Sequence, residues 1–293
     1  MSHAATDSRM QDQRPSALAP CAGYASSCGR VTLYLGDCMD IMPLLTGIDS
    51  VISDPPFSAR THAGHDAVKG DGHTGNGTKT VREVISYGAW SDEEVSAVCR
   101  MLPAHGWACI ITDHVLARDW ERRMKEAGRY VFAPIPVIAR GRSVRLTGDG
   151  PSSWTDWLIP ARTKAEIKWG TLPGVYEGNK TSIEHKGGKP LNAMCRIVED
   201  YSREGDTVLD FCMGAATTAI ACLRTGRNFV GIERDPAHYA TALQRITNEL
   251  AQGDLFAGHN VKGVARRRLS CQSEAKEGRC PPLPLPSCSL SSL

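Results

Sequence analysis

An acidic residue, two prolines and a phenylalanine directly follow a short apolar segment in the run Asp49–Phe57 (DSVISDPPF). The exocyclic amine of a nucleobase is a poor nucleophile, because its lone pair is delocalised into the ring. The carboxylate of Asp54 and the backbone carbonyl of Pro55 could accept hydrogen bonds from the two N–H groups of the amine, and proline holds that carbonyl rigidly. Phe57 offers a face on which an extruded base can stack. Taken alone, the run is also typical of an ordinary acidic turn.

A second candidate site lies between Asp206 and Glu233. An apolar run, Thr207–Phe211, leads into small residues around Gly214, and a second apolar run ends at Glu233. Ligands of α/β sheets bind at the carboxyl ends of strands. Small residues there let backbone N–H groups approach a ligand, and an acid can accept hydrogen bonds from ribose hydroxyls. The pattern predicts a nucleoside pocket, although it lacks the full glycine fingerprint of dinucleotide sites; a tight turn beside an incidental Glu is the alternative.

The elements that must position these residues alternate between short apolar strands and helices. Strands are expected at Val31–Leu35, Asp49–Ser53, Trp107–Thr112, Tyr130–Ala139, Asp156–Pro160, Thr207–Phe211 and Phe229–Glu233. Helices are expected at Met39–Leu45, behind a capping box formed by Ser91 and Glu94, and at Val115–Ala127, Leu191–Tyr201, Ala216–Thr225 and Pro236–Leu250. This alternation predicts an α/β fold with a doubly wound, mainly parallel, Rossmann-like sheet.

Composition bounds the class of protein. The chain has 293 residues, of which 41% are hydrophobic and 23% charged, and no apolar run reaches the roughly 18 residues that cross a bilayer. Its eleven cysteines lack metal-site or disulfide spacing, so we expect no metal and a reducing, cytoplasmic location. Residues 140–189 carry nine Lys and Arg against five acids, a net +4, which suits a phosphate-facing surface or a solvated one.

The order of four segments resembles the β-class S-adenosylmethionine-dependent DNA amino methyltransferases. These segments are Leu35–Met39 (LGDCM), Asp54–Phe57 (DPPF), His185–Pro190 (HKGGKP) and Asp210–Thr218 (DFCMGAATT). The resemblance implies the class I methyltransferase fold, with a methyltransferase domain at 31–252. Within the domain it implies a catalytic half at 31–138, a DNA-recognition insert at 139–184 and a cofactor half at 185–252. The polar composition of the two ends predicts a flexible arm at 1–30 and a disordered tail at 253–293.

The resemblance also implies roles for individual residues. The catalytic residues would be Asp54, Pro55, Pro56 and Phe57. The residues that hold S-adenosylmethionine would be Asp37, His185, Lys189, Pro190, Asp210, Cys212, Gly214, Ala216, Thr217, Thr218 and Glu233. Four positions depart from the family pattern: Cys212 replaces a Phe, Ala216 a Gly, Lys186 a Pro and Gly187 a Thr. The departures bear on cofactor affinity and leave the catalytic run intact.

Double-stranded DNA is the partner that the resemblance implies. Candidate contacts in the insert are Arg140, Arg142, Arg145, Arg162 and Lys164. We expect Ser58–Tyr87 to be a mobile, DNA-facing loop rather than a metal site. Asp113 is expected to cap a helix, with lining of the base pocket as the alternative. A homodimer and a separate cognate restriction nuclease stay open.

Adenine N6 is the expected target because Asp at the first motif position is commoner in the adenine enzymes of the family and Ser in the cytosine-N4 enzymes. Cytosine N4 is the alternative. Two other classes of protein stay open: a methyltransferase acting on RNA or on a protein glutamine, and a non-catalytic DNA-binding relative. The catalytic run precedes the cofactor run here, which argues against the RNA or protein enzymes.

Overall fold

The computed structural model describes residues 23–66, 88–140, 154–164, 170–179 and 188–257. The chain divides into a compact unit of residues 1–249 and a C-terminal segment of residues 250–293. Both candidate sites lie in the first unit. Among the described residues, no helix is long and apolar enough to cross a membrane.

Ten strands of the described residues form one sheet. Its order is β1 (Tyr24–Ala25), β2 (Val31–Leu35), β10 (Asn228–Glu233), β9 (Thr207–Asp210), β3 (Ser50–Ser53), β4 (Trp107–Thr112), β7 (Thr155–Arg162), β6 (Ile135–Arg140) and β8 (Tyr176–Asn179), with β5 (Tyr130–Val131) also beside β7. Strands β2, β10, β9, β3 and β4 run parallel, whereas β7 is antiparallel to β4 and to β6. The predicted mainly parallel sheet is confirmed.

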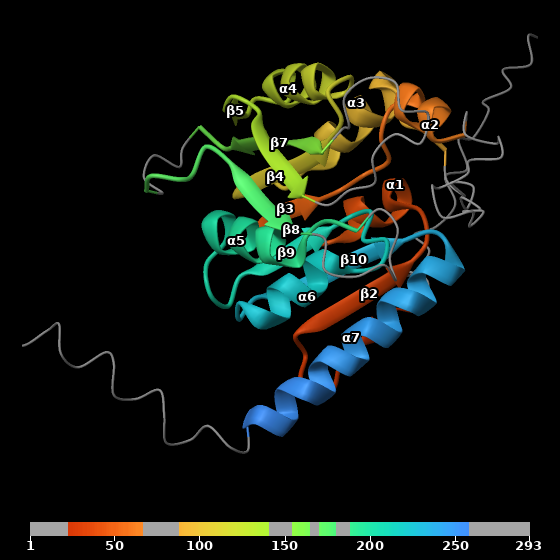
Figure 1. Cartoon of the computed structure of the whole chain (residues 1–293), viewed down its shortest axis with the longest axis vertical. Helices are drawn as coiled ribbons and strands as arrows, with labels where there is room; N and C mark the ends of the chain where they lie inside the picture. Colours follow the sequence, from red (N-terminus) through yellow and green to blue (C-terminus); the bar gives the residue numbers. More distant parts are fainter. Residues whose placement is uncertain (1–22, 67–87, 141–153, 165–169, 180–187, 258–293) are drawn as a thin grey trace, which may run out of the picture. The chain divides into compact units, whose positions relative to one another are not determined.

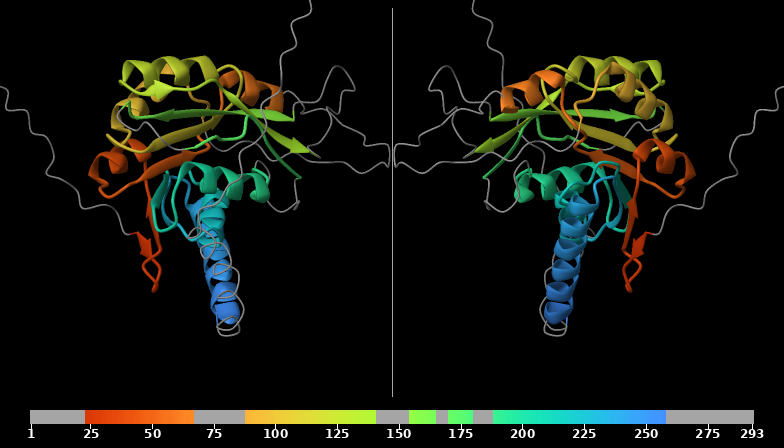
Figure 2. Two further views of the ribbon diagram at one scale, coloured as in Figure 1. Left: turned by 90° about the vertical axis from the view of Figure 1, so that its left-hand side faces the viewer. Right: turned by 90° about the vertical axis from the view of Figure 1, so that its right-hand side faces the viewer.

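Helices cover both faces of the sheet, as a doubly wound fold requires. The helices are α1 (Cys38–Ile41), the 3-10 turn η1 (Met42–Leu44), α2 (Ala59–Asp66), α3 (Asp92–Met101), α4 (Ala117–Glu126), α5 (Leu191–Tyr201), α6 (Thr217–Arg224) and α7 (Pro236–Ala257). Figure 1 shows α3 and α4 together on one side of the strands, with α5 and α6 together on the other. The turned views of Figure 2 show the same separation.

Local sequence explains the central elements. All six residues of β4 are buried, because the strand lies between β3 and β7 and is covered on both faces. The predicted capping box at Ser91 and Glu94 opens α3. Gly106 enters β4 with φ +76°, and a Cβ there would lie 1.8 Å from the carbonyl oxygen of Asp49. Only glycine permits this close approach of the turn to the neighbouring strand.

Several elements differ from the sequence prediction. Helix α2 occupies the start of the segment expected to be a loop, whose residues 67–87 lie outside the described part. The single strand expected at Tyr130–Ala139 is divided into β5 and β6, with Pro134 between them. Strand β1 lies inside the predicted flexible arm, and α7 extends to Ala257, past the predicted end of the domain. Strand β8 was not predicted, since its sequence YEGN has no strand signature.

Candidate active site

The two candidate sites leave the sheet from neighbouring strands. Strands β3 and β9 pair in parallel, with Ser50 opposite Val208 and Val51 opposite Leu209. Their carboxyl ends therefore meet at one edge of the sheet. The catalytic run (Asp54–Phe57) begins directly after β3. The turn of small residues at 211–216, which we call the nucleoside turn, begins directly after β9. The chain passes from β3 outward to β4 on one side of this pair and from β9 outward to β10 on the other side. The carboxyl ends of β3 and β9 therefore form a topological switch point, where α/β folds bind ligands.

A buried carboxylate joins the two runs. Oδ1 of Asp210 accepts hydrogen bonds from the Ser53 hydroxyl at 2.7 Å and from the Cys212 N–H at 3.2 Å. Its Oδ2 accepts from the Thr218 hydroxyl at 2.7 Å. Burial raises the pKa of Asp210 to about 6, although these hydrogen bonds lower it. Asp210 thus acts as an internal tie between the catalytic run and the nucleoside turn.

The nucleoside turn is organised by Glu233 at the end of β10. One carboxylate oxygen of Glu233 accepts from the Gly214 N–H and the other from the Asp235 N–H, both at 2.9 Å. Gly214 has φ +50°, and a Cβ built on it would meet no atom of the described residues within 4 Å. The turn therefore opens onto free space beside a half-buried carboxylate. This arrangement fits a nucleoside whose ribose hydroxyls donate to Glu233.

Asp37 lies at the next strand end. Strand β2 pairs in parallel with β10, with Leu35 opposite Glu233, and Asp37 follows two residues later. Its carboxylate is exposed and accepts from the Met39 N–H at 2.8 Å, which caps α1. Asp37, Glu233 and Gly214 consequently belong to three adjacent strand ends.

The catalytic run is held in place by a residue outside it. The Ser58 N–H and hydroxyl donate to Oδ2 of Asp113 at 3.0 and 2.5 Å, and the Thr61 hydroxyl donates to the same oxygen. The other oxygen of Asp113 accepts from the N–H groups of Val115 and Leu116, in the turn that leads into α4. Burial raises the pKa of Asp113, but the hydrogen bonds outweigh it and hold the pKa below its usual value. The N-cap residue of α4 is Leu116, without a side-chain cap, so Asp113 differs from its predicted role: it holds the turn before the helix and anchors the catalytic run.

A stack of aromatic side chains centred on Trp90 also holds the catalytic run in place. The backbone N–H of Trp90 donates to the backbone carbonyl of Phe57 at 3.1 Å. The indole of Trp90 stacks on Phe211 and on Trp120, with ring centroids 6.1 and 6.2 Å away. The backbone behind Phe57 is thereby fixed to the hydrophobic core and, through Phe211, to the start of the nucleoside turn.

Lys189 lies against the catalytic run, although the resemblance implied a cofactor contact. Its Nζ is 2.5 Å from Oδ2 of Asp54 and 4.9 Å from the centroid of the Phe57 ring. A second carboxylate oxygen, Oδ2 of Asp156 on β7, is 3.4 Å away. Pro190, the next residue, is the N-cap residue of α5. His185, Lys186 and Gly187 lie outside the described residues.

This chain is similar in sequence to known DNA methylases. The model of the N6/N4 DNA methylase family matches residues 152–244. Type II methyltransferase M2.MboI of Moraxella bovis is 38% identical over 236 residues, which cover 72% of this chain and 86% of that enzyme. The chain belongs to the family of DNA amino methyltransferases.

Other relatives match less of their own length or share mainly the fold. Type II methyltransferase M.BglI of Bacillus subtilis is 44% identical over 97 residues, and this chain spans only 23% of its length. The structure of M1.HpyAVI with SAM superposes with a TM-score of 0.54 at 20% identity, over 73% of this chain and 99% of that one. PvuII DNA methyltransferase, which is cytosine-N4-specific, gives 0.55 at 14% identity, over 78% and 93%. These structures show the class I methyltransferase fold.

Two departures of this DNA amino methyltransferase from the family pattern have visible consequences. Ala216 has φ +61° and is the one non-glycine residue of the described part with a positive φ. It therefore adopts the left-handed conformation natural to glycine, directly before Thr217 and Thr218 open α6. The pKa of the Cys212 thiol lies well above its usual value, because the Cys38 thiol and burial both disfavour the thiolate. A protonated thiol is a poor nucleophile.

The predicted DNA contacts are distributed over both edges of the sheet. Arg140 ends β6 and forms an ion pair with Glu177 at 2.8 Å. Arg162 ends the antiparallel strand β7 opposite Trp107, the first residue of β4. It therefore lies at the edge opposite to Asp54, and Lys164 follows it. Arg142 and Arg145 lie outside the described residues.

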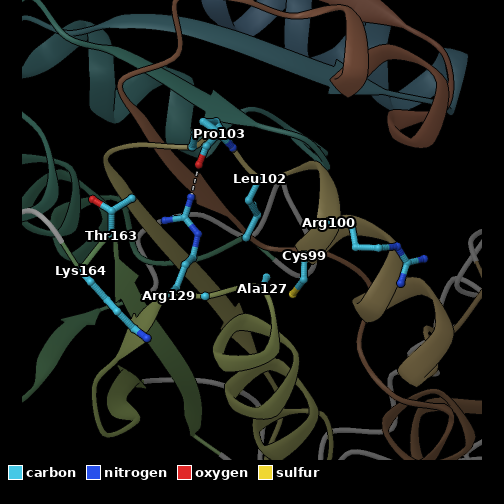
Figure 3. Close-up of a pocket in the computed structure, with 10 residues that line it drawn as sticks. Cys99, Arg100, Leu102, Pro103, Ala127, Arg129, Thr163 and Lys164 are labelled. Atoms are coloured by element: carbon cyan, nitrogen blue, oxygen red, sulfur yellow. Dashed lines mark hydrogen bonds between the residues drawn. The ribbon is translucent and has the colours of Figure 1, made fainter.

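A cavity of about 540 Å³ also lies at this opposite edge. Figure 3 shows Arg129, Thr163 and Lys164 around it, with the Arg129 guanidinium donating to the Pro103 carbonyl. The cavity is bounded by the segments that precede β4 and β5 and follow β7, where the parallel strands begin. It is separate from the site at their carboxyl ends.

Proposed function

We propose that this chain transfers the methyl group of S-adenosylmethionine to the exocyclic amine of a base in DNA, and that the base is adenine. The observation that carries the proposal is the adjacency of Asp54 and the Gly214 turn. They follow neighbouring parallel strands, joined by the hydrogen bond from Ser53 to Asp210. A methyl donor and an amine acceptor bound at these two places would meet at one edge of the sheet.

The nucleoside turn supplies suitable groups for S-adenosylmethionine. Glu233 can accept from the ribose hydroxyls, Asp37 lies at the neighbouring strand end for the adenine amine, and the open side of Gly214 leaves room for the ligand. The cofactor supplies an activated methyl group on a sulfonium. The likeness to M1.HpyAVI, whose structure holds SAM, supports this assignment.

The catalytic run would prepare the acceptor. The Asp54 carboxylate and the Pro55 carbonyl would accept hydrogen bonds from the two N–H groups of the amine, so that its lone pair is concentrated on nitrogen. Phe57 stacks on the flipped base. S-adenosylmethionine, held by Glu233 and the Gly214 turn, would supply the methyl group to this nitrogen, and its sulfur would keep the electron pair of the broken carbon–sulfur bond. The surplus proton passes from the methylated nitrogen to the Asp54 carboxylate and on to solvent.

The choice of adenine depends on Asp54 at the first position of the motif, which is the commoner residue in the adenine enzymes of the family. The likeness to the cytosine-N4-specific PvuII enzyme concerns the fold and leaves both bases within the family. Base identity is therefore the part of the proposal that needs a direct chemical test.

The experiment is nucleoside analysis of DNA from a bacterial host that lacks its own adenine and cytosine-N4 methylation. Expression of this chain should produce N6-methyladenine at a defined sequence, detected by mass spectrometry and mapped by sequencing. N4-methylcytosine in its place would overturn the base assignment and leave the transferase. DNA without either product, from cells that contain folded protein, would favour a non-catalytic DNA-binding relative.

A further inference from the structure

We infer that Asp156 and Lys189 form a buried charge triad with Asp54, in which Lys189 positions the catalytic carboxylate and Asp156 fixes Lys189. The role given to Asp54 rests on the proposed function, but the charge triad itself is a property of the folded chain. Nothing in the sequence motifs assigned Asp156, which lies within an apolar strand run, TDWLIPAR.

The three groups come from three separate elements. Asp54 follows β3, Asp156 is the second residue of β7, and Lys189 precedes α5. The Lys189 ammonium is 2.5 Å from a carboxylate oxygen of Asp54 and 3.4 Å from one of Asp156. The site therefore depends on contacts between residues that are up to 135 positions apart in the chain.

Burial makes these contacts energetically important. The side chains of Lys189 and Asp156 are 6% and 5% exposed, whereas that of Asp54 is 26% exposed. A buried carboxylate is costly without a charged or hydrogen-bonding partner. Asp156 therefore keeps the ammonium in place from the protein interior, and Lys189 presents its charge outward to Asp54.

The net charge of the charge triad is −1 when all three groups are ionised. The ammonium of the charge triad lies over the Phe57 ring, beside the place proposed for the base. The negative charge of Asp54 also reaches Asp210, whose pKa it raises. A residual negative charge favours the cationic nitrogen that exists just after methyl transfer.

The stability of the ligand-free protein tests the charge triad, because the effect of Asp156→Asn on the urea midpoint of unfolding should have opposite signs with and without Lys189. In the wild-type background, Asp156→Asn removes one attraction and should lower the urea midpoint. Lys189→Met should lower it further, because both carboxylates then lose the ammonium that lies between them. Adding Asp156→Asn to Lys189→Met should raise the midpoint again, since only the partly exposed Asp54 remains.

Asp119→Asn is the matched control. Asp119 is a carboxylate on the surface of α4, paired with Arg122 at 3.2 Å. Its replacement should shift the midpoint equally in the wild-type and Lys189→Met backgrounds. Should Lys189→Met fail to fold, recovery of folded protein in the double variant supports the charge triad. A double variant that is less stable than Lys189→Met, or equally unfolded, overturns it.

Kinetics test the positioning role. Asp156→Asn should reduce kcat by on the order of tenfold or more, as small misplacements of a catalytic group do. Its dissociation constant for S-adenosylmethionine, measured by calorimetry, should stay within about twofold, because Asp156 lies on the amine side of the site. Unchanged kcat, or a matching loss of cofactor binding, would contradict the positioning role. A wild-type chain without transferase activity would contradict the proposed function instead, while the unfolding midpoints still report on the charge triad.

Discussion

The Ser53 hydroxyl donates a hydrogen bond of 2.7 Å to the carboxylate of Asp210, and both residues are buried. Ser53 is the last residue of β3 and immediately precedes the catalytic carboxylate. Asp210 is the last residue of β9 and immediately precedes the nucleoside turn. Because this hydrogen bond joins the ends of β3 and β9, it fixes the position of the catalytic run relative to the nucleoside turn.

Asp210 should make stability depend on pH. Its pKa is about 6 in the folded protein because of burial, above the usual value of 3.8. The folded state thus favours the protonated form, and this contribution to stability is lost as the pH rises through about 6. Between about pH 5 and pH 7.5, the wild type should lose on the order of 1 kcal/mol of unfolding free energy relative to Asp210→Asn. Urea unfolding at the two pH values measures the difference; parallel pH dependence of both proteins would refute it.

Glu233 should control cofactor binding. Glu233→Ala removes the proposed ribose acceptor and also the acceptor of the Gly214 and Asp235 N–H groups. Loss of hydrogen bonds to a charged group should weaken S-adenosylmethionine binding by at least about tenfold. Calorimetry with the cofactor alone measures this, and DNA binding should be unaffected. Glu204→Gln, an exposed control, should bind as the wild type does. Equal affinity of Glu233→Ala and wild type would exclude the ribose role.

Ala216 should tolerate glycine better than a matched alanine does. The left-handed conformation costs a non-glycine residue roughly 1–2 kcal/mol, so Ala216→Gly relieves strain that offsets the added freedom of the unfolded chain. Ala219 is equally buried but lies inside α6, where glycine costs about 1 kcal/mol. The unfolding free energy of Ala216→Gly should therefore exceed that of Ala219→Gly by about 1 kcal/mol or more. Equal losses in chemical denaturation would show that residue 216 is unstrained.

Much of the fold could be predicted from local sequence. The apolar runs of β2, β4 and β9 and the capping box of α3 were readable, because burial and helix termini leave local signatures. Helix α2 was missed because ARTHAGHD has no apolar face that distinguishes it from a loop. The division of the strand at Pro134 depends on which neighbour each half pairs with, which a local pattern cannot state.

The site was predictable by residue but not by contact. The catalytic and nucleoside runs were found from their own residues, whereas their adjacency follows from the strand order. The contact of Asp113 with Ser58 and that of Asp156 with Lys189 join residues more than 30 positions apart in the chain, so no spacing rule indicates these contacts. One signal was present for Asp156: a charge inside an apolar strand must have a partner. The position of Lys189 beside Asp54 required the structure.

The most direct test of the central claim is transfer of an isotope-labelled methyl group from S-adenosylmethionine to DNA by wild type and Asp54→Ala, with cofactor affinity measured on both. The wild type should label adenine N6. Asp54→Ala should lose at least about a hundredfold in rate, because an essential acceptor of the amine is gone, and should still bind the cofactor within about twofold. Asp54→Ala that labels DNA at the wild-type rate would contradict the account.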